Sequence, residues 1–407
     1  MRILYLSQYF PPEMGAPSAR VHELSREWVR LGHEVTVVTG FPHHPTGVKA
    51  PEDRRRLFRR ERVDGIDVVR TYVYAAPNRG TLKRMVSYAS FMASAVALGG
   101  PRIRKPDVVV GTSPQLLCAV AARTIARAWA APFVFEVRDL WPESILAVEA
   151  MRENAVVRAL KAVARSLYEG SDRIVTVGEG YRQGIHQRYG IPLSKMDVVP
   201  NGIDTSLFTP GPRDNEVRRE RGWGDRFVAL YLGTLGMAHG LETLLEASKL
   251  LSDDRRFHLV FVGEGAEKDA LKRRAAELAL GNVEFVDQQP KARVPLWYAA
   301  CDLGIVSLRN TPLFQEVLPS KIFEYLGMER PLALAVGGEA RRLVEAAGAG
   351  EYVPPGDPAA LATAIRRLAA KPARLAEMGR RGRAHVLAHY DRRALAARYA
   401  GILRARL

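Results

Sequence analysis

Cysteine is scarce in this sequence, and the side chains that bind metals are not clustered. The 407 residues contain two cysteines, Cys118 and Cys301, and neither has a CxxC partner or a histidine at ligand spacing. A disulfide framework and a zinc site are therefore excluded. No low-complexity tract and no repeat of about 20–50 residues is evident, so we expect an ordinary globular protein and no resident metal.

Long hydrophobic runs are scarce as well. The apolar stretch at the N-terminus, Ile3–Leu6, is too short for a signal peptide and has no cleavage site, which predicts a cytoplasmic protein. The mostly apolar segment from Met85 to Pro101 is at the short limit for a membrane span. Basic residues on both sides favour a helix that lies on an anionic membrane surface; the alternative is a core helix with a basic rim.

Acidic residues are outnumbered. Lys and Arg total 60 against 44 Asp and Glu, which gives a formal net charge of +16. This excess favours anionic partners, such as acidic lipid or phosphorylated substrates. Nucleic acid is disfavoured because no recognised binding motif accompanies the charge.

Short apolar runs alternate with helical patterns along both halves of the chain. The predicted strands of the first half are Ile3–Ser7, Val35–Val38, Val108–Val110, Phe133–Phe135 and Ile174–Val177; those of the second are Phe227–Leu232, Leu259–Val262, Val283–Val286 and Leu303–Ser307. Continuous apolar strands separated by helices indicate parallel sheets covered on both faces. We therefore predict an α/β protein of two doubly wound, Rossmann-like domains that face each other across a cleft.

The domain boundary is expected near Val198–Asp204, followed by a polar linker from Thr209 to Asp225. This gives an N-terminal domain, 1–198, which faces acceptor and membrane, and a C-terminal donor domain, 199–390. The last helix, 391–407, is expected to pack back on the N-terminal domain. Within the first domain, Ser18 is predicted to cap a helix that ends at Gly32.

The segment between Glu316 and Glu324 carries the strongest functional signal. Pro319 predicts a helix start, which places Glu316 before the helix and Glu324 about one turn inside it. Amides of the first turn, with Lys321, could hold an anion, and the two carboxylates could accept hydrogen bonds from hydroxyl groups on either side. The plain alternative is a loop and an amphipathic helix with two solvated glutamates.

Several motifs accompany this segment in a fixed order. They are Tyr9–Gly15, Leu31–Val35, Glu136–Ser144, Val199–Asp204, Gly263–Gly265 and the two glutamates separated by seven residues. In this order the chain resembles the retaining glycosyltransferases of the GT-B fold. More narrowly, it is similar to the branch that builds bacterial surface polysaccharides, such as colanic-acid and O-antigen fucosaminyltransferases.

The resemblance implies roles for individual residues. Glu324 would bind the ribose of the nucleotide, and Glu316 the transferred sugar. The diphosphate would lie against Gly15 and the backbone near Leu318 and Ser320. The pocket would be shaped by Gly263 and Gly265. At the position of the family's frequent histidine stands Arg138, and the neighbouring Asp139 is the carboxylate expected to touch sugar or acceptor.

Two departures from the family concern the diphosphate clamp. Many members carry Arg and Lys where this chain has Thr234 and His239. A histidine is often neutral at pH 7, so the positive charge of that loop is reduced. We expect Lys321 to compensate, with Arg309 as a weaker candidate.

The resemblance implies a front-face transfer with retention, in which the leaving phosphate oxygen takes the acceptor proton and no metal or other cofactor is required. The donor would be a nucleotide-diphosphate sugar, with UDP as the expected base. The acceptor would be a polyprenyl-diphosphate-linked or saccharide molecule at the inner face of the cell membrane. Two alternatives stay open: a nucleotide-sugar 2-epimerase, and a non-catalytic subunit that docks a polysaccharide assembly to the membrane.

Overall fold

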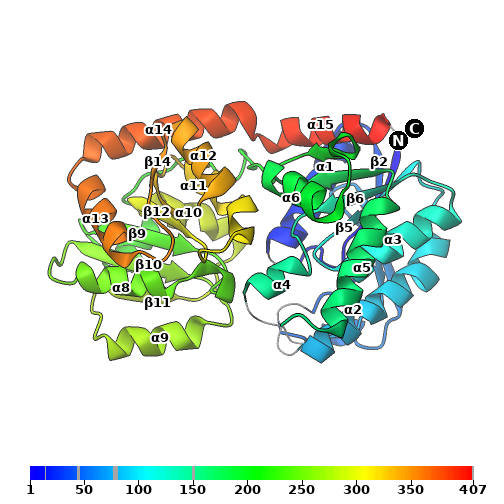
Figure 1. The fold of residues 1–407 in the computed structure, drawn as a ribbon, viewed down its shortest axis with the longest axis horizontal. Helices are drawn as coiled ribbons and strands as arrows, with labels where there is room; N and C mark the ends of the chain where they lie inside the picture. The colour runs from blue at the N-terminus through cyan, green and yellow to red at the C-terminus, as the bar shows by residue number, and fades with distance from the viewer. Residues whose placement is uncertain (14, 44–45, 77–80, 149–151, 406–407) are drawn as a thin grey trace. The chain divides into compact units, whose positions relative to one another are not determined.

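The computed structural model describes residues 1–13, 15–43, 46–76, 81–148 and 152–405 (Figure 1). The chain divides into two compact units. Unit 1 comprises Met1–Asn201 together with Arg392–Leu407, and unit 2 comprises Gly202–Asp391. Both are parallel-dominated sheets covered by helices, so the α/β fold class predicted from the apolar runs is confirmed.

Unit 1 contains an eight-stranded sheet in the order β3-β4-β2-β1-β5-β6-β7-β8, parallel except for the β3–β4 pair. Its strands are β1 (Arg2–Leu6), β2 (Glu34–Gly40), β3 (Phe58–Val63), β4 (Ile66–Thr71), β5 (Val108–Thr112), β6 (Phe133–Val137), β7 (Arg173–Thr176) and β8 (Met196–Val198). The sequence jumps across the sheet between β4 and β5. The connections that leave the carboxyl ends of β1 and β5 therefore run to opposite sides of the sheet, as at the ligand crevice of other doubly wound sheets.

Helices cover both faces of this sheet (Figure 1). They are α1 (Ala16–Arg30), α2 (Thr81–Ser94), α3 (Leu116–Ala128), α4 (Glu143–Ala147), α5 (Ala155–Glu169), α6 (Glu179–Tyr189) and α15 (Arg392–Arg404). Helix α15 packs on α1, where the Trp28 indole donates a hydrogen bond to the Ala396 carbonyl at 3.0 Å and lies edge-on to Tyr399. The C-terminal helix thus completes the core of unit 1.

Unit 2 contains a six-stranded parallel sheet in the order β11-β10-β9-β12-β13-β14. Its strands are β9 (Phe227–Leu232), β10 (Phe257–Val262), β11 (Val283–Val286), β12 (Leu303–Ser307), β13 (Leu332–Ala335) and β14 (Gly350–Tyr352). Its helices are α7 (Glu216–Glu220), α8 (Glu242–Leu250), α9 (Lys268–Glu277), α10 (Val294–Ala300), α11 (Lys321–Gly327), α12 (Gly338–Ala347), α13 (Pro358–Ala369) and α14 (Pro372–His389). The switch of direction falls between β9 and β12.

Two local predictions are wrong. Ser18 does not cap α1, because the helix already begins at Ala16 after Gly15 and carries Pro17 in its first turn. The polar linker from Thr209 to Asp225 contains a short helix, α7, which Asn215 caps through its side chain. The predicted end of α1 is confirmed, because Gly32 follows the C-cap residue Leu31 with a φ of 80°.

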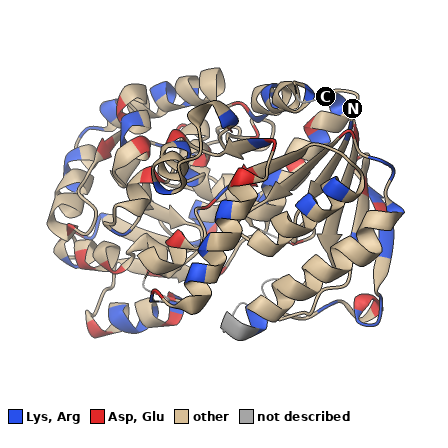
Figure 2. Ribbon diagram, turned by 45° about the vertical axis from the view of Figure 1, so that its right-hand side comes forward, with Lys and Arg blue, Asp and Glu red and all other residues tan. Residues whose placement is uncertain are grey.

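Basic side chains are spread over the surface among acidic ones (Figure 2). No helix in the described part of the chain combines the length and apolar character needed to cross a bilayer.

Candidate functional site

The clearest candidate site lies where β9 and β12 part at their carboxyl ends. The two strands pair only through Leu303 with Ala229 and Gly304 with Leu230. Beyond that point the Tyr325 hydroxyl enters between them. It donates to the Leu230 carbonyl at 2.6 Å and accepts from the Leu232 amide at 3.2 Å. The side chain from α11 thus replaces the missing ladder bonds and holds the sheet open at its switch point.

Two glycine loops form one wall of this crevice. The Gly233 amide donates to the Val262 carbonyl, and the Gly263 carbon lies so close that a Cβ there would stand 2.0 Å from the Gly233 oxygen. Gly263 also has a φ of 148°, in the region that favours glycine. Gly265 approaches the Leu235 carbonyl in the same way, at 2.1 Å for a built Cβ. Both predicted glycines are therefore required for the packing of the loop that carries Gly233 and Thr234.

Lys321 places a cation against this loop. Its Nζ lies 3.8 Å from the centroid of the Tyr231 ring, and a Cβ at Gly233 would be 3.0 Å from it. The residue as a whole is partly exposed, but the Nζ atom is shielded from solvent and has no hydrogen-bond partner in the described structure. Burial lowers the pKa of Lys321 to about 7, and the nearby Glu324 opposes that shift.

The two residues that replace the family's clamp supply no charge here. Thr234 is exposed, and its carbonyl accepts a hydrogen bond from Tyr231 at 2.8 Å. The ring of His239 lies near Tyr231 and 3.4 Å from the Ser307 carbonyl. Burial and the Lys321 charge lower the pKa of His239 to about 3, so it is neutral at physiological pH. Lys321 therefore brings a basic group to this loop.

Glu324 lies one turn along α11 from Lys321, as the spacing predicts. Its Oε2 accepts a hydrogen bond of 2.6 Å from the hydroxyl of Tyr298, which is fully buried on α10. Burial raises the pKa of Glu324, although the Tyr298 bond and the charges of Lys321 and Lys291 favour its ionised form. Tyr298 thus fixes the orientation of the carboxylate. No sequence pattern predicts this contact, since Tyr298 stands 26 residues before Glu324.

The rest of the glutamate segment precedes α11 in the chain. Glu316 ends a short 3-10 helix, Leu313–Glu316, and is partly exposed. Leu318 is buried, and Ser320 precedes the helix without a side-chain cap bond. Pro319 therefore does lie at a helix start, which comes at Lys321, but α11 has only seven residues and offers a short first turn.

The predicted residues of unit 1 gather at the carboxyl edge of its own sheet. Gly15 precedes α1 with a φ of 123°. The Ser113 hydroxyl, after β5, accepts hydrogen bonds from the amides of Arg138 at 2.8 Å and Asp139 at 3.3 Å. Arg138 also donates to the Pro17 carbonyl at 3.3 Å. The loops after β1, β5 and β6 thus meet, and all three predicted residues lie within them.

Asp139 is half-buried, and its Oδ2 accepts a hydrogen bond of 3.0 Å from Ser144. Burial raises its pKa, while the Ser144 bond opposes the rise. This environment suits a carboxylate that holds a proton more readily than a surface aspartate does.

A buried ion pair lies beneath this edge and was not predicted. Glu136 is wholly buried and accepts hydrogen bonds from Arg20, Thr112 and Tyr5. Its pKa is lowered, because the charges of Arg20 and Arg138 outweigh the effect of burial. The Arg20–Glu136 separation is 2.9 Å. Glu136 stands in an apolar run, Phe133–Val137, which is where a paired charge is hardest to anticipate.

Arg20 and Arg392 both hold the chain where it leaves unit 1. Arg20 donates to the carbonyls of Val199 and Pro200 at 3.0 and 2.9 Å. Arg392 donates to the Asn201 carbonyl at 3.0 Å and pairs with Glu23 of α1. Helix α1 therefore anchors both connections to unit 2.

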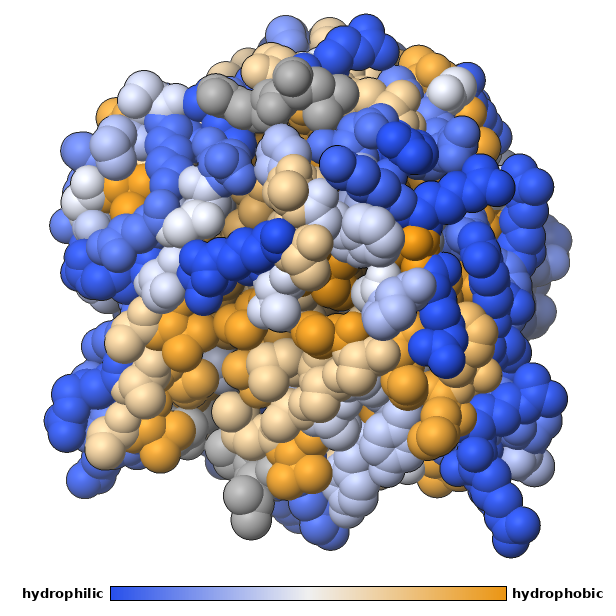
Figure 3. Space-filling model, turned by 90° about the vertical axis from the view of Figure 1, so that its right-hand side faces the viewer, coloured by the Kyte–Doolittle hydropathy of each residue, from blue (hydrophilic) through white to orange (hydrophobic). Residues whose placement is uncertain are grey.

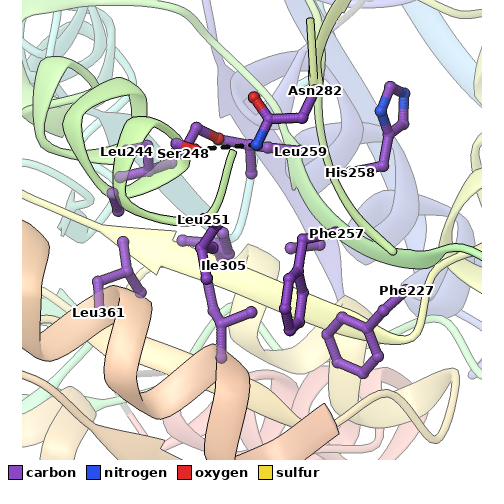
Figure 4. Close-up of a pocket in the computed structure, with 13 residues that line it drawn as sticks. Phe227, Leu244, Ser248, Leu251, Phe257, His258, Leu259, Asn282, Ile305 and Leu361 are labelled. Carbon is purple, nitrogen blue, oxygen red and sulfur yellow. Dashed lines mark hydrogen bonds between the residues drawn. The ribbon is translucent and has the colours of Figure 1, made fainter. Parts of the chain in front are cut away.

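Two cavities lie in the described part of unit 2. One cavity of about 10 Å³ lies in the core of unit 2, near the amino ends of β9 and β10, and is lined mainly by apolar side chains (Figure 4). A second, of about 30 Å³, borders Arg309 and Gly337. Each has room for about one or two water molecules, so neither holds a nucleotide. No group of three potential metal ligands occurs among the residues described.

Two family profiles match the chain. The "Glycosyl transferase 4-like domain" matches residues 15–202, and "Glycosyl transferases group 1" matches residues 213–385. Among curated relatives, the probable glycosyltransferase WbjE of Pseudomonas aeruginosa is 26% identical over 65% of this chain, a match that spans 66%, just under two thirds, of that relative. The putative colanic acid biosynthesis glycosyl transferase WcaI of Escherichia coli is 26% identical, over 85% of this chain and 84% of its own length.

Solved structures share the architecture over nearly the whole length. The sucrose-phosphate synthase of Thermosynechococcus elongatus superposes with a TM-score of 0.77 at 19% identity, covering 99% of this chain and 98% of that one. Anabaena HepE in complex with UDP and glucose gives 0.75 at 20% identity, with 99% of both chains covered. At these sequence identities, the similarity shows a shared fold and nothing more specific.

Proposed function

Because the chain belongs to the glycosyltransferases of the GT-B fold, we propose that it is a retaining enzyme of surface polysaccharide synthesis. It moves a sugar from a nucleotide-diphosphate sugar to a lipid-linked or saccharide acceptor. The observation that carries this proposal is the crevice of unit 2, where a buried lysine and an oriented glutamate stand at the switch point of a doubly wound sheet. The colanic-acid relative supports the pathway, and UDP in the HepE structure supports the donor base.

In the donor site, Glu324 binds the ribose hydroxyls with the carboxylate oxygen that Tyr298 leaves free. Lys321 faces the diphosphate across the Gly233 loop, with the backbone near Leu318 and Ser320 on the other side. Glu316 binds hydroxyls of the transferred sugar. Gly263 and Gly265 keep the Gly233 loop in the position that this arrangement needs.

Lys321 supplies the positive charge that Arg and Lys of the diphosphate clamp supply in many relatives. A fixed cation beside the leaving diphosphate stabilises the charge that develops as the sugar departs. The phosphate oxygen then takes the acceptor proton on the same face, so the configuration is retained. Since Lys321 balances this charge, we propose that turnover needs no resident metal; unchanged activity in EDTA is the expected result.

In unit 1, Asp139 and Arg138 bind acceptor or sugar hydroxyls, and Gly15 leaves room for the diphosphate beside the start of α1. Asp139 is suited to this role because two hydrogen bonds hold it in place: Ser144 donates to its carboxylate, and its amide donates to Ser113.

The acceptor end of the enzyme works at an anionic membrane surface. Helix α2 turns Tyr88 and Phe91 into the core but leaves Val86, Ala89 and Ala93 exposed. Exposed basic residues accompany this stripe: Lys83, Arg84 and Arg102 near α2, and Arg54, Arg55 and Arg56 beside the exposed Leu57. Figure 3 shows apolar surface bordered by hydrophilic side chains on one face of the molecule. Apolar contact together with basic charge is what interfacial binding requires.

The first test is thermal unfolding with UDP, GDP, ADP and CMP in turn. A nucleotide at 100 times its dissociation constant stabilises the folded protein by about 2.7 kcal/mol. We expect UDP to stabilise the parent and Glu345→Ala, an exposed α12 control, but not Glu324→Ala. If no nucleotide stabilises the parent, the donor-site assignment is wrong.

The second test follows turnover of UDP-sugars with and without a membrane lipid extract. Transfer that depends on the extract supports the proposal. Conversion of the donor without any acceptor would instead identify an epimerase, and nucleotide binding without turnover would identify a non-catalytic subunit.

A further inference from the structure

Lys321 is set in surroundings that do not favour its charged form. Its Nζ is shielded from solvent and lacks a hydrogen-bond acceptor within the described structure. Three groups face it: the ring of Tyr231 from β9, the ring of His239 from the loop after β9, and the carboxyl of Glu324 from its own helix. The Tyr231 hydroxyl is already bonded to the Thr234 carbonyl, so only its ring face is offered to the amine.

We propose that above neutral pH Lys321 lacks its proton in the empty site and takes up one proton when the donor diphosphate binds, so that donor binding and protonation of this lysine form a single linked step. This inference rests on the donor site proposed above. The reason is electrostatic: an ammonium buried without an acceptor is penalised, whereas a diphosphate within a few ångströms supplies both the acceptors and the opposite charge. The proton comes from the solvent, and no bond to the sugar is involved.

The pKa of Lys321 in the site without donor supports this proposal. At a pKa of about 7, about a tenth of the molecules carry the proton at pH 8, and about nine tenths carry it at pH 6. Two of the three groups that face Lys321 do not titrate in this interval in its place. The pKa of His239 is lowered to about 3, and that of Tyr231 is raised far above its ordinary value by burial. Glu324 is the remaining neighbour, and the Tyr298 bond favours its carboxylate.

The consequence for function is a donor affinity that depends on pH. Above pH 7 each further unit weakens donor binding by up to tenfold, because the bound state keeps the proton that the free site has lost. An arginine at this position would stay charged throughout and would lack this dependence.

Calorimetric titration of the full-length protein with UDP at pH 8, in two buffers of different ionisation enthalpy, tests the inference. Phosphate groups of UDP are fully ionised at this pH, so the nucleotide itself contributes little proton exchange. We expect the uptake of about 0.9 proton per UDP at pH 8, from the occupancy given above.

Lys321→Met keeps a side chain of similar length and removes the titrating group. It should bind UDP more weakly, with an enthalpy that is the same in both buffers and an affinity that is flat between about pH 8 and pH 9, where the affinity of the parent falls. UDP binding by the parent with no difference between buffers overturns this inference and leaves the donor site intact. Uptake that persists in Lys321→Met also overturns it. No UDP binding at either pH overturns the donor site and the inference together.

Discussion

Tyr298→Phe is the substitution that best isolates the chemistry of Glu324. The change removes one hydroxyl, which donates at 2.6 Å to a buried carboxylate, and leaves the ring and its edge-on packing against Tyr325 in place. Hydrogen bonds to charged groups contribute about 1.5–3 kcal/mol, and a buried acceptor that loses its donor costs a similar amount. We therefore expect Tyr298→Phe to destabilise unit 2 by about 2 kcal/mol when Glu324 is ionised.

The cost should depend on pH. Burial already raises the pKa of Glu324, and loss of the Tyr298 donor raises it further. A carboxyl whose pKa is raised on folding loses stability as pH rises from its unfolded value through its folded value. At low pH the variant can keep Glu324 protonated, so the expected loss is smaller than at alkaline pH, where the full loss of about 2 kcal/mol appears.

Tyr325→Phe is the matched control. It also removes a buried tyrosine hydroxyl, but the bonds lost are to the backbone of Leu230 and Leu232, which does not titrate. Urea titrations read by hydrogen-exchange mass spectrometry on peptides of unit 2 give the free energy of opening for each variant. If the loss in Tyr298→Phe is as independent of pH as that in Tyr325→Phe, the carboxylate is not what Tyr298 stabilises.

Three further predictions concern the glycine loop, the lysine and the basic surface. Gly263→Ala should destabilise unit 2 by about 3 kcal/mol or more in urea titrations, because its Cβ would meet the Gly233 carbonyl at 2.0 Å; Gly281→Ala, with no atom within 4 Å, should be nearly neutral. The pKa of Lys321 is lowered in the folded state, so between pH 7 and pH 10 the parent gains stability as pH rises, by up to about 1.4 kcal/mol per unit, and Lys321→Met should lose that slope in chemical denaturation. Replacing the arginines at 54–56 with serine should weaken binding to anionic vesicles, measured by co-sedimentation, by about 1 kcal/mol per residue, with little change in binding to neutral vesicles. An equal loss of binding to both kinds of vesicle would rule out an electrostatic contact.

The sequence predicts most of the apolar strands but misses the buried strand β13, Leu332–Ala335, as well as the partly exposed strand β3. The predicted strands Phe227–Leu232 and Leu303–Ser307 agree with β9 and β12 at both ends, because central parallel strands are apolar on both faces. The hairpin of β3 and β4 was not predicted. The residues of β3, Phe58–Val63, include four charged side chains in six positions, as suits an antiparallel edge strand but not an apolar pattern.

In the candidate site, the sequence predicts proximity within one helix but not contacts between separate elements. Lys321 and Glu324 could be placed together because they share one helix, and a spacing of three is fixed by helix geometry. Tyr298 and Tyr325 could not be assigned, since their roles depend on how α10 and α11 pack beneath the split between β9 and β12. The roles of Glu316, Arg138 and Asp139 stay predictions.

The packing of α15 against α1 bears on how the chain folds during synthesis. Unit 2 is inserted, in sequence, between the main body of unit 1 and its last helix, and the ends of the insertion meet in the bridge of Ile203 with Asp391. On the ribosome, α15 emerges only after all of unit 2. Unit 2 can therefore close its core first, while Trp28 on α1 still lacks its Tyr399 and Ala396 partners. The N-terminal part of the chain, although made first, is completed last, and until then it exposes an apolar groove that a chaperone can occupy.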